Sequence, residues 1–493
     1  MGASSSSERT KTSLSSAKLL SDFYSLGDQF FTAQQPSGIT EPEWVAISSS
    51  TADLLNLNPE SIKKLDLGLL SGNKVAKGTN PLAMVYAGHQ FGSYTPQLGD
   101  GRGLLIGEIK GQDGFLYDLH LKGAGQTPYS RMGDGRAVLR SSIREYLCSE
   151  AMAALDVPTT RALSIVKGAD QVIRERVEPS AMLCRVAQTH LRFGTFEYFN
   201  YTSQHDELKQ LLDYIILRNF PLLVPDEEGY VSFYQAVLER TAFMTAKWQA
   251  VGFCHGVMNT DNMSIMGETF DYGPFGFMER YNPAFVPNHS DQAGRYAFNQ
   301  QPNIGYWNCA CLGQALLSLI PEEQIRKALD DYPMFFGKAY LTEMRSKLGL
   351  IDQDDADDRL VGQLLGILHT ERLDYTNFFR TLAKVDFESV ESLPESKSLA
   401  LKEWLIVYRK RLEDEGAFCP VKRSRYCLDR NPKYILRNYL AQAAIERAED
   451  GDYSEVNKLQ KILSDPFSEQ PEFDEYAKDT PASVCGLQLS CSS

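Results

Sequence analysis

The sequence lacks long hydrophobic runs and an excess of positive charge. The most apolar stretch, residues 211–224, is interrupted by Asp213, Arg218 and Asn219 and is too short to span a bilayer. The Ser-rich residues 1–16 have no apolar core of the kind that secretory signals carry. The formal net charge of −14 predicts a surface that repels nucleic acids and anionic lipids. We therefore expect no membrane partner and no nucleic-acid partner, and a location in the bacterial cytoplasm, with mitochondria as the alternative in a eukaryote.

Several common site motifs are also missing. The nine cysteines include no CxxC pair and no zinc-finger spacing, and an odd number in a long chain favours a reduced setting. There is no GxxxxGK[ST] phosphate loop and no GxSxG nucleophile elbow. Cys485 and Cys491 lie in a polar C-terminal stretch, where they are either a redox element or ordinary cysteines.

What is present is an ordinary globular composition, with 43% apolar and 23% charged residues over 493 positions. This length predicts more than one lobe. We expect an α+β, two-lobed fold: a tail and leader over 1–80, a strand-rich nucleotide-binding lobe over 81–204, a helical lobe over 205–414 with a catalytic segment at 252–308, and a C-terminal extension over 415–493.

Local patterns support this division. Leu104–Ile109 and Phe115–Leu121 flank an Asp-Gly pair and predict a β-hairpin, and residues 136–155 have the periodicity of an amphipathic helix. Two further strands are expected on either side of a turn at Gly168. Helices are expected beyond residue 205, at 206–219, 232–251, 309–319, 322–331, 358–370, 375–384, 396–414 and 431–449.

Charge is distributed unevenly along the chain. Residues 101–200 contain thirteen Lys and Arg and eleven Asp and Glu, although the whole chain is strongly acidic. A locally basic stretch of this kind indicates a small anionic ligand such as a nucleotide, and chance with surface ion pairs is the alternative.

Candidate phosphate contacts fall in this basic stretch. The loop Gly99-Asp100-Gly101-Arg102-Gly103 precedes a strand, where its backbone N–H groups could approach phosphate oxygens. Lys122 ends the next strand, and Glu145 in the following helix is a candidate partner for it, as in kinases. Asp118 is expected on the solvent face. The stripe Arg136, Arg140 and Arg144 is most simply a solvated helix face.

The strongest group of candidate catalytic residues lies in the loop-rich segment. His255 to Asn262 is followed by Asp271-Tyr272-Gly273. A kinase-type site needs a base for the incoming hydroxyl and oxygen ligands for Mg²⁺ or Mn²⁺. Asp261 could be that base, and Asn262 and Asp271 could bind the metal. Val257 occupies the position where the kinase HRD motif carries its aspartate.

At these residues the sequence resembles the selenoprotein O (YdiU-like) family of protein adenylyltransferases, which have a protein-kinase-like fold. The matching stretches are 97–102, 121–128, 134–137, 158–161, 255–277 and the ending Cys491-Ser492-Ser493. The likeness runs from about residue 20 to the C-terminus.

The resemblance implies that AMP is transferred from ATP to Ser, Thr or Tyr hydroxyls of proteins. It places a set of residues at the nucleotide, namely Gly99, Gly101, Arg102, Lys122, Asp134, Gly135, Arg185, Arg192 and Asp271. It further implies that Glu145 holds Lys122, that Asp261 accepts the proton and that Asn262 and Asp271 bind magnesium. UMP transfer from UTP, γ-phosphate transfer and a nucleotide-binding pseudokinase scaffold remain alternatives.

Overall fold

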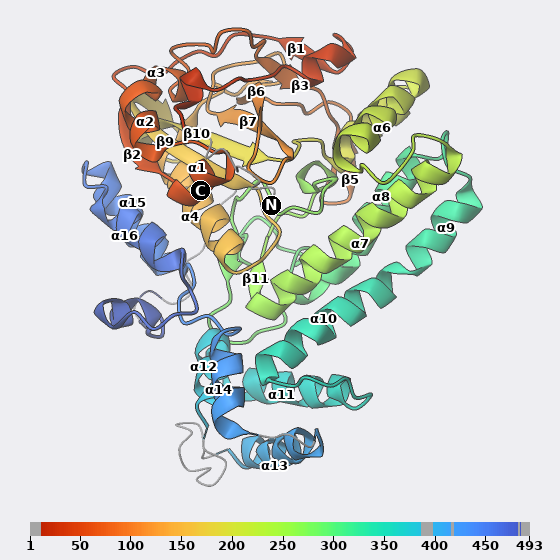
Figure 1. Cartoon of the computed structure of the whole chain (residues 1–493), viewed down its shortest axis with the longest axis vertical. Helices are drawn as coiled ribbons and strands as arrows, with labels where there is room; N and C mark the ends of the chain where they lie inside the picture. The colour runs from red at the N-terminus through yellow and green to blue at the C-terminus, as the bar shows by residue number, and fades with distance from the viewer. Residues whose placement is uncertain (1–10, 386–397, 416–418, 482–483, 485–493) are drawn as a thin grey trace, which may run out of the picture.

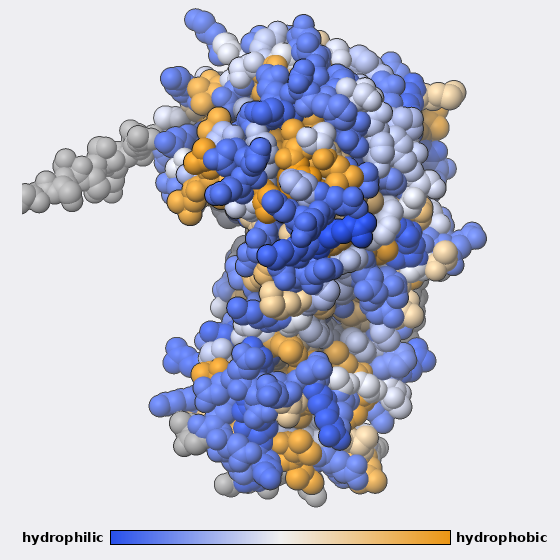
Figure 2. Space-filling view, turned by 90° about the vertical axis from the view of Figure 1, so that its right-hand side faces the viewer, coloured by the Kyte–Doolittle hydropathy of each residue, from blue (hydrophilic) through white to orange (hydrophobic). Residues whose placement is uncertain are grey.

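The computed structural model describes residues 11–385, 398–415, 419–481 and 484. A sheet-rich N-terminal region lies above a helical C-terminal region in Figure 1, so the chain has an α+β fold. Among the described residues, no helix combines the length and the apolar character needed to cross a bilayer. Figure 2 shows a largely hydrophilic face with scattered hydrophobic residues and an indentation between its upper and lower parts.

One large antiparallel sheet forms the N-terminal region, with its main strands in the order β1-β3-β6-β7-β10-β9-β2, while β8 pairs with β10. Its strands are β1 (Phe31–Ala33), β2 (Glu43–Ile47), β3 (Leu82–Met84), β6 (Gly103–Lys110), β7 (Leu116–Lys122), β8 (Ala137–Val138), β9 (Arg161–Ile173) and β10 (Val177–Ala187). The short helices α1 (Ser49–Leu54), α2 (Pro59–Leu65) and α3 (Leu67–Leu70) and the long helix α4 (Leu139–Ala154) accompany it.

The hairpin and the long helix that the sequence predicts are confirmed as β6–β7 and α4. The expected turn at Gly168 is wrong, because β9 runs straight through this residue and the chain reverses at 174–176. A Cβ at Gly168 would lie 2.9 Å from the Ile39 Cβ, so close packing is the reason for this glycine. The segment 1–80, expected to be a tail and leader, contributes strands β1 and β2 to the sheet.

Helices build the C-terminal region. They are α5 (Phe193–Tyr201), α6 (His205–Asn219), α7 (Glu227–Val251), α8 (Gln301–Ala315), α9 (Glu322–Asp330), α10 (Tyr332–Leu348), α11 (Asp357–Glu371), α12 (Tyr375–Ala383), α13 (Leu399–Asp414), α14 (Pro420–Leu428), α15 (Asn438–Glu449) and α16 (Ser454–Leu463). A helix overlaps each range expected from periodicity, but α8 begins and ends earlier than the expected 309–319, and α15 begins only at Asn438, not at 431. Helices α5, α10, α14 and α16 are additional. Between α7 and α8 the chain is mostly irregular, with the strands β11 (Phe253–Cys254) and β12 (Gly276–Phe277).

The last helices return to the sheet-rich region. In Figure 1, α15 and α16 lie beside α4 and β2. The Tyr453 hydroxyl donates to Glu43 Oε2 at 2.9 Å, and Asn457 Nδ2 donates to the Val45 carbonyl at 3.3 Å. Residues late in the sequence therefore cover helix α4, which follows the hairpin β6–β7.

Candidate active site

A cavity of about 630 Å³ lies where the sheet meets the irregular segment after α7. Its wall includes every residue that the sequence analysis places at the nucleotide or the metal, and Asp261 as well: Gly99, Gly101, Arg102, Lys122, Asp134, Gly135, Arg185, Arg192, Asp261, Asn262 and Asp271. Glu145 lies behind this wall, 1% exposed. The structure thus brings together residues separated by up to 172 positions in the chain.

A continuous series of ion pairs crosses the cavity floor. Lys122 on β7 pairs with Glu145 on α4, and Arg185 Nε on β10 donates to Glu145 Oε1 at 2.7 Å. Arg185 also donates to Asp271 Oδ1 at 2.6 Å, and Arg192 donates to Asp271 Oδ2 at 2.8 Å. Each carboxylate is therefore held by two cations, and the series ties β7, α4 and β10 to the irregular segment.

The ion pairs keep both carboxylates ionised. Burial by itself would raise the pKa of Asp271, but Arg185, Arg192 and Lys122 hold that pKa well below its usual value. The pKa of Glu145 is also lowered, because the charges of Arg185 and Lys122 outweigh the effect of burial. Burial lowers the pKa of Lys122, with Glu145 opposing. Two negative and three positive side chains leave this series with a positive excess, which favours an anionic ligand.

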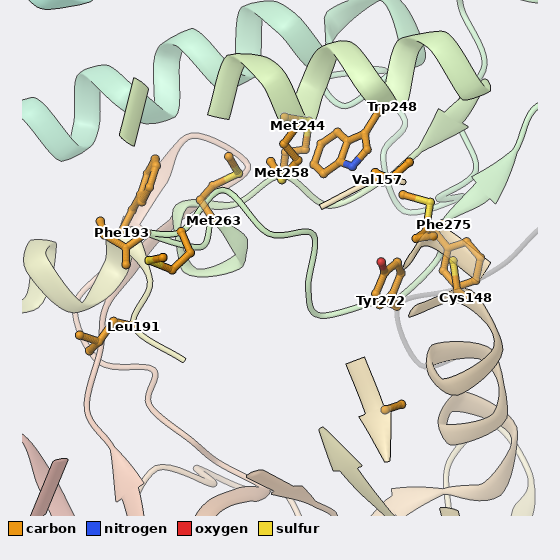
Figure 3. Packing of buried hydrophobic residues seen from close by; sticks show 14 of the residues in the cluster. Cys148, Val157, Leu191, Phe193, Met244, Trp248, Met258, Met263, Tyr272 and Phe275 are labelled. Atoms are coloured by element: carbon orange, nitrogen blue, oxygen red, sulfur yellow. The ribbon is translucent and has the colours of Figure 1, made fainter. Parts of the chain in front are cut away.

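Helix α7 and a hydrophobic core support the irregular segment. Figure 3 shows Met244 and Trp248 of α7 beside Met258, with Tyr272 and Phe275 packed near Cys148. Trp248 Nε1 donates to Thr269 Oγ1 at 2.7 Å, and the His255 ring stacks on Trp248. Buried methionines at 258 and 263 therefore flank the polar residues Asn259–Asn262, which fixes the short loop at both ends.

Asp261 lies in this loop and lines the cavity. Its Oδ2 accepts a hydrogen bond from Gln90 Nε2 at 3.3 Å, whereas its buried Oδ1 has no hydrogen-bond partner among the described residues. Burial raises the pKa of Asp261 to about 7, and the neighbouring Asp271 adds to this rise while Arg192 opposes it. A buried carboxyl group at a cavity wall, with a pKa raised to about 7, is suited to accept a proton.

Asn262 and Asp271 offer oxygen atoms of the kind that Mg²⁺ and Mn²⁺ prefer. The Asn262 amide nitrogen donates to the Val257 carbonyl at 3.0 Å, which leaves the amide oxygen as the acceptor end of the side chain. Both residues border the same cavity. The donor set therefore fits a hard divalent cation.

The glycine-rich loop needs its glycines for close packing. Gly99 has a φ of +83°, and a Cβ there would overlap the Tyr129 ring. Asp134 is fixed differently, by two hydrogen bonds from Arg174 to its carboxylate at 2.8 and 2.9 Å. Arg174 also lines the cavity, as Arg102 does. It is a candidate ligand contact that the sequence analysis did not identify.

Two expectations about charged residues are wrong. Asp118 is fully buried, where it binds Arg218 and the His190 backbone N–H, because its strand face turns inward. The arginine stripe on α4 is not a solvated face either. Arg140 binds Glu178 at 2.9 Å, and Arg144 donates to the Phe275 carbonyl and lies over its ring.

Other cavity residues were missed by the sequence analysis. His120, Gln90 and Phe91 line the wall, and the His120 Nε2 lies 3.3 Å from Oδ2 of Asp100 in the glycine-rich loop. His120 alternates with Lys122 along β7, so the two-residue period of a strand was a usable signal for it. Cys485 and Cys491 lie outside the described residues, and their expected redox role stays a prediction.

Comparison with known proteins agrees with this geometry. The family model described as "Protein adenylyltransferase SelO" matches residues 13–464. A protein nucleotidyltransferase YdiU of Myxococcus xanthus is 49% identical over 464 residues, covering 93% of this chain and 95% of that protein. The proteins of the same name from Stutzerimonas stutzeri and Vibrio cholerae are each 48% identical, covering 96% of this chain and 98% of their own lengths.

The family match and these relatives identify an enzyme of the nucleotidyltransferase class, and the cationic cavity with its carboxylates agrees with that class. The chain belongs to the SelO (YdiU) family.

Proposed function

We propose that this protein transfers AMP from ATP to Ser, Thr or Tyr hydroxyls of other proteins, in a reaction that depends on Mg²⁺ or Mn²⁺. The observation that carries the proposal is the ion-pair series from Lys122 to Arg192 beside Asp261 and Asn262. The names of the family model and of the bacterial relatives support transfer of a nucleotidyl group.

In the proposed reaction, the acceptor hydroxyl oxygen forms a bond to the α-phosphorus of ATP. The bond from that phosphorus to the oxygen bridging to the β-phosphorus breaks, and pyrophosphate leaves. The hydroxyl proton passes to the carboxylate of Asp261. Lys122, Arg102, Arg185 and Arg192 neutralise phosphate charge and orient the nucleotide, and positioning of this kind supplies most of the catalysis in phosphorus transfer.

Asn262 and Asp271 would hold the divalent ion, which supplies further neutralisation of the phosphate oxygens. Arg185 and Arg192 already hold Asp271 in its ionised form. The carboxylate is therefore ready to bind a cation without first losing a proton.

We further propose that the fold is protein-kinase-like and that the protein works in the bacterial cytoplasm. The pairing of a strand lysine with a glutamate on the following helix is the arrangement that protein kinases use. The bacterial origin of the relatives supports the location.

Intact-mass spectrometry of the protein and an acceptor protein, incubated with Mg²⁺ and either ATP or UTP, tests the proposal. We expect a gain of AMP with ATP. A gain of phosphate would instead indicate a kinase, a gain of UMP from UTP would indicate uridylyl transfer, and bound ATP without modification would indicate a scaffold. Asp271→Ala is expected to abolish transfer, and full activity in that variant would contradict the site assignment.

A further inference from the structure

The hairpin β4–β5 (Gly88–Gln90 and Ser93–Thr95) lies against the loop that carries Asp261. Three successive hairpin residues each contact this loop. The His89 backbone N–H donates to Thr260 Oγ1 at 2.7 Å, Gln90 Nε2 donates to Asp261 Oδ2, and the Phe91 backbone N–H donates to Asn259 Oδ1 at 3.2 Å. The hairpin therefore fixes the position of the loop residue by residue.

A buried carboxylate locks this contact. Glu197 on α5 is fully buried, and its Oε2 accepts a hydrogen bond from Thr260 Oγ1 at 2.5 Å. Its Oε1 accepts from the His89 ring Nδ1 at 2.6 Å. Thr260, His89 and Glu197 thus form a closed ring of three hydrogen bonds, in which the single hydroxyl of Thr260 joins the hairpin backbone to the helix. Burial strengthens such a network, because water cannot replace its members.

The backbones in this region approach so closely that no side chain fits between them. A Cβ at Gly88 would lie 2.7 Å from Asp261 Oδ1. A Cβ at Gly194, in the first turn of α5, would overlap the Ala87 carbonyl and lie 3.4 Å from the Asp261 Cα. The Ala87 N–H donates to the Gly194 carbonyl at 2.9 Å. Hairpin, helix and loop therefore form one packed unit around Asp261.

Phe91 adds backbone strain to the same hairpin. Its φ is +50°, a region that bulky residues rarely adopt, and its N–H is held by both Asn259 Oδ1 and the Tyr296 hydroxyl. Strain of this kind persists only where surrounding contacts impose it. The hairpin tip is thus held in one conformation at the edge of the cavity.

We propose that the β4–β5 hairpin is the positioning element for Asp261 and that Thr260, His89 and Glu197 are positioning residues, which act through the loop backbone. This inference rests on the proposed function, because Asp261 is the proposed proton acceptor. None of the three is needed to hold the nucleotide, since none lines the cavity. Their loss should therefore reduce turnover and leave nucleotide affinity unchanged.

Thr260→Val and Thr260→Ser provide the test, because valine keeps the shape of threonine and loses the hydroxyl, whereas serine keeps the hydroxyl. We expect Thr260→Val to lower kcat for transfer by about tenfold to 100-fold, since a shift of about 1 Å at a reacting group has effects of this size. The Kd for ATP with Mg²⁺ should change less than about twofold. Thr260→Ser should restore most of the turnover. Thr241→Val, a buried threonine on α7, is the matched control and should leave both values unchanged.

Normal turnover in Thr260→Val, or an equal loss in Thr260→Ser, would overturn the proposal, as would a parallel loss of ATP affinity. Amide hydrogen exchange of residues 256–263 separates this proposal from the proposed function. If the wild-type protein transfers no nucleotide, the proposed function fails, and faster exchange in Thr260→Val than in Thr260→Ser still supports the β4–β5 hairpin as the element that positions the loop. Cys311 has a ligand atom within 4.8 Å of those of His89 and Glu197. Stoichiometric zinc that Cys311→Ser abolishes would therefore also overturn the proposal, because Glu197 would then be a metal ligand.

Discussion

At the scale of single residues, the buried charges of the cavity floor are stabilised by pairing with one another. Lys122, Glu145, Arg185, Asp271 and Arg192 are drawn from four separate parts of the chain, and each has a partner of opposite sign. Removing one member of such a buried series leaves another charge uncompensated, which is generally more costly than the pair is stabilising. Loss of Lys122 leaves no carboxylate of the series unpaired, because Glu145 remains paired with Arg185.

Lys122→Met should therefore weaken ATP binding without unfolding the protein. We expect the Kd for ATP with Mg²⁺ to rise about tenfold to 100-fold, since removal of a charge that contacts phosphate directly has effects of about 2 kcal/mol or more. Isothermal titration calorimetry measures this change. Lys110→Met, an exposed lysine at the end of the adjacent strand β6, is the matched control and should bind ATP normally. Unchanged affinity in Lys122→Met would contradict the assignment.

Glu268 is a second residue whose charge state depends on burial. Burial raises its pKa to about 8, and its Oε2 has no hydrogen-bond partner among the described residues. The folded protein therefore holds a proton that the unfolded chain releases near its ordinary value of 4.5. Because the folded-state pKa is the higher one, this group's contribution to stability is complete below about pH 4.5 and is lost as the pH rises towards 8.

Glu268→Gln should remove this pH dependence. We expect the variant to have the thermal midpoint of the wild type at pH 5 and a higher midpoint at pH 8, by several degrees. Differential scanning fluorimetry across this range measures the difference. Glu279→Gln, a substitution near β12, is the control for loss of a carboxylate. An equal shift at both pH values would show that titration is not the cause.

At the scale of elements, periodicity and turn chemistry predicted most of the structure around the site. The hairpin β6–β7, helix α4 and the order of Lys122, Glu145, Asp261 and Asp271 all follow from local pattern. Local pattern could not show that β9 passes straight through Gly168. The glycine is needed there because the side chain of Ile39, which is distant in the sequence, packs against it. Likewise, nothing local indicates that Glu197 and His89 meet behind Asp261, since 108 residues separate them.

Substitution by alanine is expected to have opposite effects on stability at two helical glycines. Gly194→Ala in α5 should destabilise the protein, because the added methyl group would overlap the Ala87 carbonyl. Gly366→Ala in α11 should stabilise it by about 0.5–1 kcal/mol, because nothing lies within 4 Å and alanine has the higher helix propensity. Thermal denaturation of both variants measures the contrast, and an unchanged or raised midpoint in Gly194→Ala would show that close approach at Gly194 does not matter.

At the scale of the whole molecule, contacts between distant parts of the chain complete the site. The hydrophobic core extends from Phe23 near the N-terminus to Leu463 near the end of α16 without a break between the two regions. Length predicted more than one lobe, and the uneven charge predicted a small anionic ligand. They could not predict that the C-terminal helices would pack on α4, because amphipathic helices have no sequence signal for their partner.

Leu459→Ala should lower stability and reveal whether this packing supports the site. Leu459 on α16 is 1% exposed, so its truncation is expected to cost about 2–4 kcal/mol. The thermal midpoint should fall, and ATP affinity below the midpoint should remain close to normal. Ile406→Ala on α13, where the side chain is 69% exposed, is the control and should change stability by less than about 0.5 kcal/mol. A normal midpoint in Leu459→Ala would show that α16 is not part of the cooperative fold.

The return of α15 and α16 has a consequence for synthesis on the ribosome. The strands and helix that bear Lys122 and Glu145 leave the exit tunnel early, but the surfaces of α4 and β2 that α16 covers stay open until residues beyond 463 have emerged. N-terminal parts of a chain generally fold first during translation. In this protein, the apolar surfaces of α4 and β2 therefore stay exposed to solvent and to chaperones until α16 has been synthesised.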